Sequence, residues 1–404
     1  MSNDFLTQEQ FLDLCTNNVL NRTNVSITPW EYIECFRGPQ AQDLKVAVAI
    51  TIINCIIFVT GIIGNAAVCF VIFKHKSLNT PTDYYLVNLA VSDITLLLFG
   101  LPYDVMLYWH QYPWIFGQYF CQARALFSEM ASYVSVLTVV VFSTERYVAI
   151  CHPLIKVAVS SLQRCLRIIL ILWVVSFFCA LPFAIHSGVD YITHPEEPQN
   201  IIMESAFCAM TAQPENIPLT EVSSIVFFVI PMAVILYQYV KMGIVIRRSA
   251  KSQSSLGRGI SGSVHGRNKR HQEQRNNVVK MLSFIALGFF VCWCPFHIQR
   301  LLSVYMNNSN DFDELNYWMY TVAGVLYYIS STVNPIVYNV MSNRMRNAFR
   351  QVICGVEIRG MKRLSRRSTI PTYTSDRLSN VFVDEEEALN FGKTPSLQPI
   401  LEKA

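Results

Sequence analysis

The chain has 404 residues, of which 52% are apolar and only 15% are charged. Soluble domains usually carry about 25% charged residues, so the composition argues against two or three soluble domains. Lys and Arg number 32 and Asp and Glu 28, and the resulting net charge of +4 excludes the basic field of a nucleic-acid-binding protein. Twelve cysteines are too few for a disulfide-stapled scaffold.

The apolar residues gather in seven long runs separated by polar loops. The first run has 28 residues without a formal charge. As a helix it would measure about 42 Å, which exceeds a hydrocarbon core of roughly 30 Å. The runs are Val46–Phe73, Tyr84–Trp109, Gln118–Cys151, Ile168–Ile185, Val222–Ile246, Val278–Leu302 and Leu315–Met341. Any one run also suits a buried core helix, but seven would leave a soluble fold almost no exterior. We therefore predict an all-α, seven-transmembrane helix bundle over residues 46–341.

Loop charges predict the orientation of the bundle. Lys and Arg concentrate between the third and fourth runs and between the fifth and sixth, which makes these loops cytoplasmic. His186–Pro218 and Tyr305–Glu314 contain acids but no Lys or Arg, so they are expected outside, together with the amino-terminal tail of residues 1–45. The sequons at Asn21, Asn24 and Asn307 all fall on this outer side and are predicted glycosylation sites.

Residues 342–354 have the pattern of a short amphipathic helix on the membrane surface. Apolar residues recur there at helical spacing with Arg between them, and the pattern ends at Cys354. Cys354 is a candidate palmitoylation site, with an unmodified thiol as the alternative. The Ser/Gly/Arg-rich segment Ser249–Gln274 predicts a flexible cytoplasmic loop, and residues 355–404 predict a disordered cytoplasmic tail.

Short motifs on successive spans together resemble the rhodopsin-like (class A) G protein-coupled receptors. They are Gly64-Asn65, Leu89-Ala90-Val91-Ser92-Asp93, Glu145-Arg146-Tyr147, Trp173, Pro231, Cys292-Trp293-Cys294-Pro295 and Asn334-Pro335-Ile336-Val337-Tyr338. The resemblance covers about residues 45–354 and implies a multi-pass plasma-membrane receptor that docks a G protein. No nucleophile–base set or metal-ligand spacing suggests an enzyme. The alternative is a seven-span transporter or channel that uses buried charges as an ion relay, although no internal repeat is visible.

The resemblance also implies how such a receptor switches. Arg146 would pair with Glu145 at rest and open the G-protein site when released. The kink at Trp293 and Pro295 would act as the pivot. The implied activation switch comprises Arg146, Trp293, Phe289, Pro231, Tyr239, Asn334 and Tyr338. The implied sodium pocket comprises Asp93, Ser135, Ser331 and Asn334, with an ordinary buried polar network as the alternative. No other cofactor is expected.

Two outward-facing cysteines are expected to form a disulfide. Cys121 begins the third span and Cys208 is the only cysteine of the second outer loop, so the bond would hold this loop over the bundle mouth. Cys15 and Cys35 in the amino-terminal tail form a second candidate pair, for which the sequence leaves both outcomes open.

Single residues exclude two ligand classes. The seventh span lacks the Schiff-base Lys of an opsin, and Ser128 occupies the place of the Asp found in amine receptors. Closer likeness is to the neuromedin U, pyrokinin and CAPA receptor group. It rests on Gly100-Leu101-Pro102, Trp109 to Gly117, Ser128-Glu129, Phe142 to Tyr147 and Phe296-His297 followed by Arg300. This likeness implies an amidated peptide ligand with an Arg-containing C-terminal motif, and signalling through Gq and calcium.

Five residues are predicted to bind this ligand. Asp104 and Glu129 would receive its cationic side chain; the alternative for Glu129 is that it only neutralises Arg300 or Arg124. Phe296, His297 and Arg300 would contact its amidated end, with a satisfied core histidine as the alternative for His297. The other expected partners are membrane lipid and an arrestin that reads phosphates on the tail; nucleic acid is not expected.

Overall fold

The computed structural model describes residues 29–76, 78–152, 161–193, 200–211, 218–256, 262–306 and 310–355. Its contacts divide the chain into a unit of residues 1–355 and a second unit of residues 356–404. The second unit, which includes the predicted cytoplasmic tail, lies outside the described residues.

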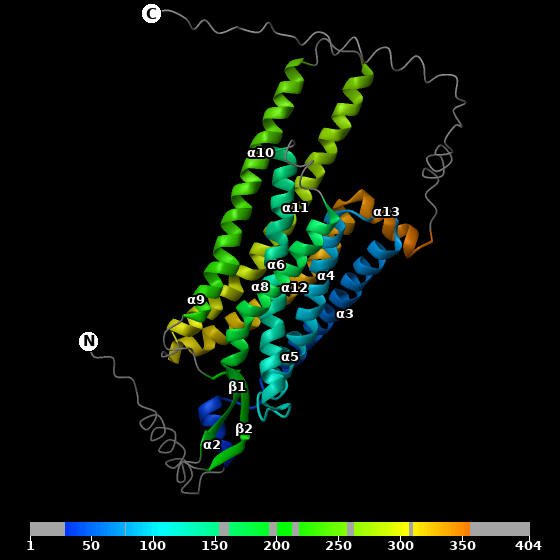
Figure 1. The fold of residues 1–404 in the computed structure, drawn as a ribbon. Coiled ribbons are helices and arrows are strands. Elements are labelled where there is room, and N and C mark those ends of the chain that lie inside the picture. The colour runs from blue at the N-terminus through cyan, green and yellow to red at the C-terminus, as the bar shows by residue number, and fades with distance from the viewer. Residues whose placement is uncertain are drawn as a thin grey trace, which may run out of the picture. The chain divides into compact units, whose positions relative to one another are not determined.

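The first unit is a helix bundle, which confirms the predicted fold class (Figure 1). Helix α6 packs against α4, α8, α10 and α11, and α12 packs against α3, α4 and α11. The long bundle helices are α3 (Leu44–Lys74), α4 (Pro81–Phe99), α6 (Gly117–Cys151), α8 (Leu162–Ile185), α10 (Ile230–Leu256), α11 (Gly262–Tyr305) and α12 (Asn310–Met341). The short helices of the second and fifth predicted spans are α5 (Leu101–Trp109) and α9 (Leu219–Ser224).

Six stretches of the described chain are long and apolar enough to cross a membrane. The stretch of α12 is not among them, although this helix has 32 residues. Its sequence explains the difference, because Tyr, Ser, Thr and Asn interrupt the apolar residues. At 1.5 Å per residue α12 is still about 48 Å long, enough to span the bilayer beside its neighbours.

Two helical irregularities follow from proline. Pro102 is the second residue of α5, and Gly100 lies between the end of α4 and the start of α5. Pro231 lacks an N–H for the ladder of α10, and the five residues before α10, Ile225–Val229, form the π-helical turn η1. A proline removes one backbone bond, and a π turn accommodates one extra residue in a helix.

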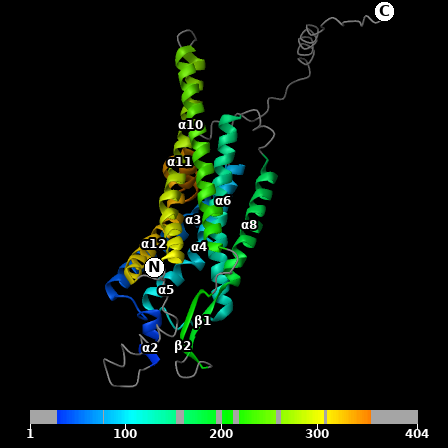
Figure 2. The ribbon, with the colours of Figure 1, turned by 90° about the vertical axis from the view of Figure 1, so that its left-hand side faces the viewer.

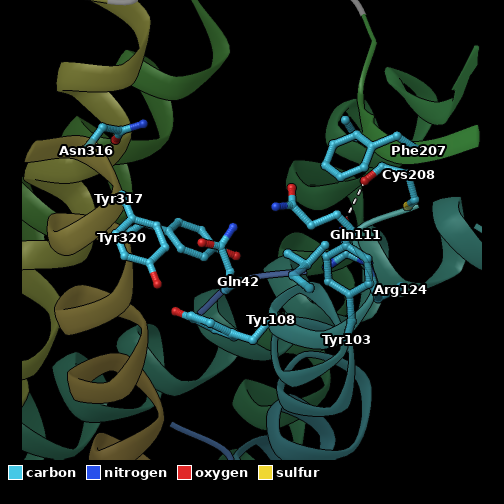
Figure 3. A pocket seen from close by; sticks show the side chains of 12 residues that line it. Gln42, Tyr103, Tyr108, Gln111, Arg124, Phe207, Cys208, Asn316, Tyr317 and Tyr320 are labelled. Atoms are coloured by element: carbon cyan, nitrogen blue, oxygen red, sulfur yellow. Dashed lines mark hydrogen bonds between the residues drawn. The ribbon is translucent and has the colours of Figure 1, made fainter. Parts of the chain in front are cut away.

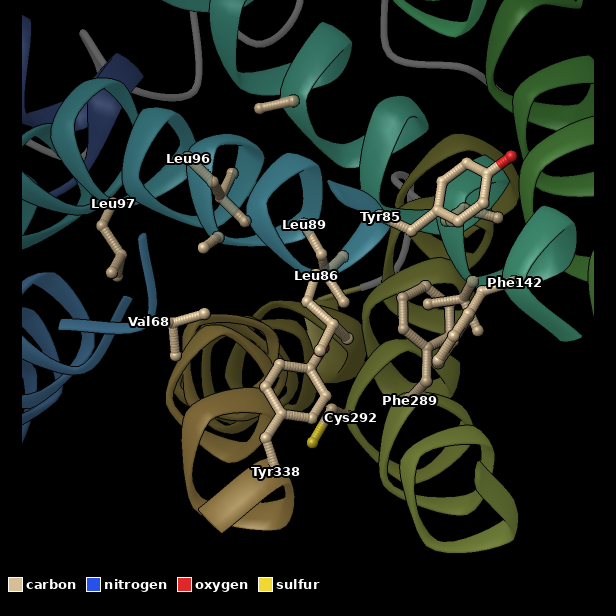
Figure 4. Close-up of a cluster of buried hydrophobic side chains, with 14 of the residues drawn as sticks. Val68, Tyr85, Leu86, Leu89, Leu96, Leu97, Phe142, Phe289, Cys292 and Tyr338 are labelled. Atoms are coloured by element: carbon tan, nitrogen blue, oxygen red, sulfur yellow. The ribbon is translucent and has the colours of Figure 1, made fainter. Parts of the chain in front are cut away.

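Side chains from all the long bundle helices contribute to the bundle core, part of which Figure 4 shows. Val68 of α3, Leu96 of α4, Phe142 of α6, Phe289 of α11 and Tyr338 of α12 are all buried in it. Membrane helices otherwise expose apolar residues to lipid, so this packing sets which face of each helix points inward.

One segment corrects the expectation of a purely helical chain. Strands β1 (Ser187–Thr193) and β2 (Ile201–Met210) form an antiparallel hairpin in the loop between α8 and α9. Val189 pairs with Cys208 in its register. The prediction considered only the charge of this loop and missed its β-branched and aromatic residues, which favour strands.

A second correction concerns the amino-terminal tail. Helix α2 (Pro29–Arg37) lies beside the hairpin, at the end of the bundle that we call the hairpin end (Figure 2). Its residues Tyr32 and Ile33 are buried against Tyr112 and Ile202. Proline suits the first helical position, and the apolar face of α2 needs this cover, so part of the predicted tail is ordered.

The predicted flexible loop Ser249–Gln274 is also shorter than expected. Helix α10 continues to Leu256 and α11 begins at Gly262. Arg, Lys and Gln are good helix formers and no proline interrupts them, so both helices extend past their apolar parts. At the same end of the bundle, α13 (Asn343–Val352) falls within the segment predicted to be an amphipathic helix.

Candidate functional site

A cavity of about 480 Å³ opens at the hairpin end. Figure 3 shows Tyr317 and Tyr320 of α12 on one side and Tyr103 and Arg124 on the other, with Gln42 between them. The described residues that line it are Gln42, Tyr103, Leu107, Tyr108, Gln111, Arg124, Phe207, Cys208, Ala209, Asn316, Tyr317 and Tyr320. An aromatic wall with a few polar groups is typical of a site for an organic ligand.

Asp104, on α5, is held by tyrosines of α12. Its carboxylate accepts a hydrogen bond of 2.7 Å from Tyr328 and a longer one of 3.4 Å from Tyr320, which also lines the cavity. Gly100 makes this approach possible, because a Cβ there would lie only 2.6 Å from the Tyr328 hydroxyl. The glycine of the Gly-Leu-Pro motif therefore positions a predicted ligand residue.

Glu129 and Arg300 form an ion pair between α6 and α11. Arg300 Nη1 lies 2.6 Å from Glu129 Oε1, and the side chains are 19% and 17% exposed. The Arg300 guanidinium also lies 5.0 Å from the ring centre of Phe183 and 5.3 Å from that of Phe296. The pairing is the one that the sequence left open as an alternative for Glu129. The partial exposure still leaves the carboxylate within reach of a ligand.

Aromatic rings connect this ion pair to the middle of the bundle. Phe296 stacks on Tyr327 at 4.3 Å, and Trp293 meets Tyr327 edge-on at 5.0 Å. Trp293 in turn stacks on Phe289 at 4.5 Å, deeper in the core. Tyr327 therefore links the predicted ligand residue Phe296 to the predicted pivot residue Trp293.

His297 faces the π-helical region of the fifth span. Its Nδ1 lies 3.1 Å from the Ser224 hydroxyl, and its ring stacks on Phe228 at 4.7 Å. The side chain is buried, and its Nε2 has no hydrogen-bond partner among the described residues. His297 and Arg300 share one neighbour, Phe296, whose ring centre lies 5.4 Å from that of His297 and 5.3 Å from the Arg300 guanidinium.

The four residues of the predicted sodium pocket do come together. Asn334 donates a hydrogen bond of 2.9 Å to Asp93, and Ser135 and Ser331 lie beside the same carboxylate. Within the described chain, the Ser331 hydroxyl is a buried polar group without a hydrogen-bond partner in the side-chain network. An oxygen-rich set of this kind suits a small hard cation. No three His, Cys, Asp or Glu side chains of the described residues come together in a way that could hold a metal ion.

Arg146 occupies the opposite end of α6. It donates a hydrogen bond to the Thr82 hydroxyl, and its guanidinium lies 5.3 Å from the Phe142 ring centre. Glu145 instead accepts a hydrogen bond of 3.0 Å from Tyr85, so the implied Glu145–Arg146 pair is not among the ion pairs of the described chain. No acid holds Arg146 within salt-bridge distance there.

Comparison with known proteins decides the family. Residues 64–338, more than half of the chain, match the family described as "7 transmembrane receptor (rhodopsin family)". The chain belongs to this receptor family. Membership accounts for the spans of the bundle, including the polar α12, and makes the protein a multi-pass membrane receptor.

Relatives within the family carry peptide-receptor names. The chain is 32% identical to the pyrokinin-1 receptor of Drosophila melanogaster, over 90% of this chain and 92% of that receptor. It is 35% identical to neuromedin-U receptor 2 of Mus musculus, over 80% and 79% of the two chains. Neuromedin-U receptor 1 of Homo sapiens is 33% identical, over 79% and 76%. The resemblance inferred from the motifs is confirmed.

A disulfide anchors the hairpin of this receptor to α6. Cys121 and Cys208 are bonded, with Cα atoms 5.8 Å apart, as predicted. Tyr103 donates a hydrogen bond of 2.6 Å to the Cys208 carbonyl, which fixes the same strand over the cavity. Cys35 is also disulfide-bonded, and Cys15 lies outside the described residues.

The amino-terminal segment is the part of the site that the sequence prediction missed. Arg37 pairs with Asp190 at 2.9 Å, donates to the Ser205 carbonyl at 2.9 Å and lies over the Phe207 ring. Gln42 follows and lines the cavity. The sequence offered one signal, the apolar face of residues 29–37. The predicted glycosylation sites Asn21, Asn24 and Asn307 lie outside the described residues.

Proposed function

We propose that the protein is a receptor for an amidated neuropeptide with an Arg-containing C-terminal motif, and that it signals through Gq and calcium. The observation that carries the proposal is the similarity to pyrokinin and neuromedin-U receptors over about four fifths or more of this chain. In this proposal the hairpin end faces outward, which agrees with the acidic loops there and with the basic loops at the other end.

The arrangement of acids supports a cationic ligand group. Asp104 borders the cavity through Tyr320, and Glu129 lies deeper with Arg300. The Arg of the peptide would bind the second oxygen of Glu129 while the Asp104 carboxylate adds its charge from α5. Arg300 and Phe296 would contact the amidated end of the peptide. A displacement of Phe296 would then shift Trp293, because both rings pack on Tyr327.

The other end of the bundle would receive the G protein. Arg146 is held only by a hydroxyl and a ring in the described chain, so its release breaks no ion pair. Tyr239 lies near the Arg146 guanidinium, and Tyr338 is buried with a hydroxyl that lacks a partner among the described residues. These tyrosines can therefore take up new partners when α11 moves about Pro295. The π turn at Pro231 would let α10 follow.

Three further elements complete the proposal. Sodium would bind at Asp93 in the resting receptor and stabilise it. The amphipathic α13, with Met345 and Ala348 buried and Cys354 exposed after its last turn, would lie on the membrane with Cys354 palmitoylated. Arrestin would bind phosphates on the tail. The match to a receptor family leaves the transporter alternative without support.

A cell assay tests the proposal. Cells expressing the chain are challenged with synthetic peptides that end in an Arg-containing motif, each as the amide and as the free acid, while intracellular calcium is recorded. The proposal predicts a response to amides that the free acids evoke only at much higher concentration, and its loss when Gq is inhibited. A response to neither form, with the receptor at the cell surface, contradicts it.

A further inference from the structure

Among the described residues that line the cavity, Arg124 of α6 is the only charged one. Its guanidinium carbon lies 3.8 Å from the ring centre of Tyr103, so one face of the group is covered by an aromatic ring. Its Nε is buried and has no hydrogen-bond partner among the described residues. The ion pairs of the described chain leave Arg124 out.

The two acids near Arg124, Glu129 and Asp104, are bound to other residues. Glu129, five positions further along α6 and so about 7.5 Å along the helix axis, is paired with Arg300 at 2.6 Å. Asp104 is close enough to act on Arg124 through its charge, but its carboxylate binds the hydroxyls of Tyr328 and Tyr320. Each carboxylate near Arg124 therefore has a different partner.

A buried donor without an acceptor costs free energy, which a ligand can recover by supplying one. A guanidinium stacked on a ring keeps its N–H edges free, and these edges match the planar geometry of a carbonyl or carboxylate. We propose that Arg124 is a ligand-binding residue whose guanidinium donates hydrogen bonds to a carbonyl or carboxylate oxygen of the peptide, in the cavity that Gln42 and Phe207 also line.

This subsite is opposite in charge to the acidic sites of Asp104 and Glu129, and it rests on the proposed function. Because an amidated peptide has no terminal carboxylate, the oxygen belongs to an acidic or amide side chain, to a backbone carbonyl or to the terminal carboxamide. Glu129 lies about 7.5 Å further along the axis of α6 than Arg124, so the cationic group and the acceptor group of the ligand would bind at different depths.

The test combines receptor variants with peptide variants. The probe is a synthetic amidated peptide with an Arg near its C-terminus, chosen because it activates the wild-type receptor. The variants are Arg124→Gln, Arg124→Lys and the control Lys45→Gln, which removes an exposed positive charge at the same end of the bundle. Binding and calcium responses are normalised to the receptor measured at the cell surface.

We expect Arg124→Gln to lower the affinity for the peptide about 10-fold or more, because the ligand oxygen loses its donor and the Tyr103 ring loses the guanidinium stacked on it. Arg124→Lys should lower the affinity less, since it keeps the charge without the planar donor edges. Lys45→Gln should leave the affinity unchanged. One peptide arm replaces acidic side chains by their amides, and another replaces single backbone carbonyls by thiocarbonyls, which are weaker acceptors. If a peptide replacement lowers the affinity for the wild-type receptor but not for Arg124→Gln, the replaced group carries the oxygen that binds Arg124.

Unchanged affinity for both Arg124 variants at normal surface expression overturns the subsite while the proposed function stands. If Arg124→Gln does not reach the surface, Arg124→Lys decides alone, and its wild-type affinity overturns the subsite. A wild-type receptor that no amidated peptide activates overturns the proposed function and the subsite with it.

Discussion

Arg300 Nη1 lies 2.6 Å from Glu129 Oε1, so a single ion pair joins α11, the helix with the pivot tryptophan, to α6. The same guanidinium lies between the rings of Phe183 and Phe296. Any ligand group that draws Glu129 or Arg300 toward itself must therefore change the contact between these helices. This contact links ligand binding to movement of α11.

Removing one member of the pair should destabilise the receptor more than removing both. Glu129→Gln or Arg300→Gln leaves a charge without its partner inside the bundle, which typically costs about 3 to 5 kcal/mol, whereas the double variant leaves none. Thermal unfolding of the purified receptor measures the difference. Equal midpoints for single and double variants would show that the pair does not bear on stability.

Sodium should lower agonist affinity through Asp93. An ion there would connect α4 to Ser135 of α6 and to Ser331 and Asn334 of α12, and so favour the resting arrangement. Replacing choline chloride by sodium chloride at constant ionic strength should weaken agonist binding to the wild type but not to Asp93→Asn. Thr95→Ala serves as a control, because the Thr95 hydroxyl on the same helix donates to the Val91 carbonyl and not to a residue of the pocket. Sodium sensitivity that survives in Asp93→Asn rules out this site.

The disulfide should be required for a folded hairpin. Cys121 and Cys208 close a loop with a sequence separation of 87, for which the chain-entropy relation gives about 4 to 5 kcal/mol. Cys121→Ser, Cys208→Ser and the double variant should therefore lose surface expression and peptide binding to the same extent. Cys179→Ser, at a free and exposed cysteine, is the control. A single variant that binds normally contradicts the role of the bond.

The position of residues 29–43 at the hairpin end should depend on the whole Arg37 side chain more than on its ion pair with Asp190. Asp190 is 55% exposed, and such a surface pair contributes about 0 to 1 kcal/mol, whereas Arg37 also binds the Ser205 carbonyl and covers Phe207. Arg37→Ala should therefore release Gln42 from the cavity and lower peptide potency clearly, and Asp190→Asn should lower it less. Hydrogen exchange of residues 29–43 checks the release directly. Equal effects of the two variants would show that the ion pair alone holds residues 29–43 in place.

Much of this architecture was accessible from the sequence because a bilayer leaves few choices. Long uncharged runs predict spans, and a Cys at the start of α6 and another in the hairpin predict their bond. Helix α2 and the hairpin were missed because their cover comes from distant residues, as with Tyr32 against Tyr112 and Ile202. The partner of Glu129 stayed open for the same reason: spacing along α6 gives no information about which side chain of α11 faces it.

The most direct test of the account is whether Glu129 recognises the charge of the ligand. The active amidated peptide and an analogue with citrulline, a neutral isostere, in place of its Arg are compared on the wild type and on Glu129→Gln. Citrulline should lower the binding affinity by about 2 kcal/mol, or about 30-fold, on the wild type. It should lower the affinity little on Glu129→Gln, because the Arg charge of the peptide has no carboxylate partner at position 129 of that variant. An equal loss on both receptors would contradict it and would leave Glu129 only as the partner of Arg300.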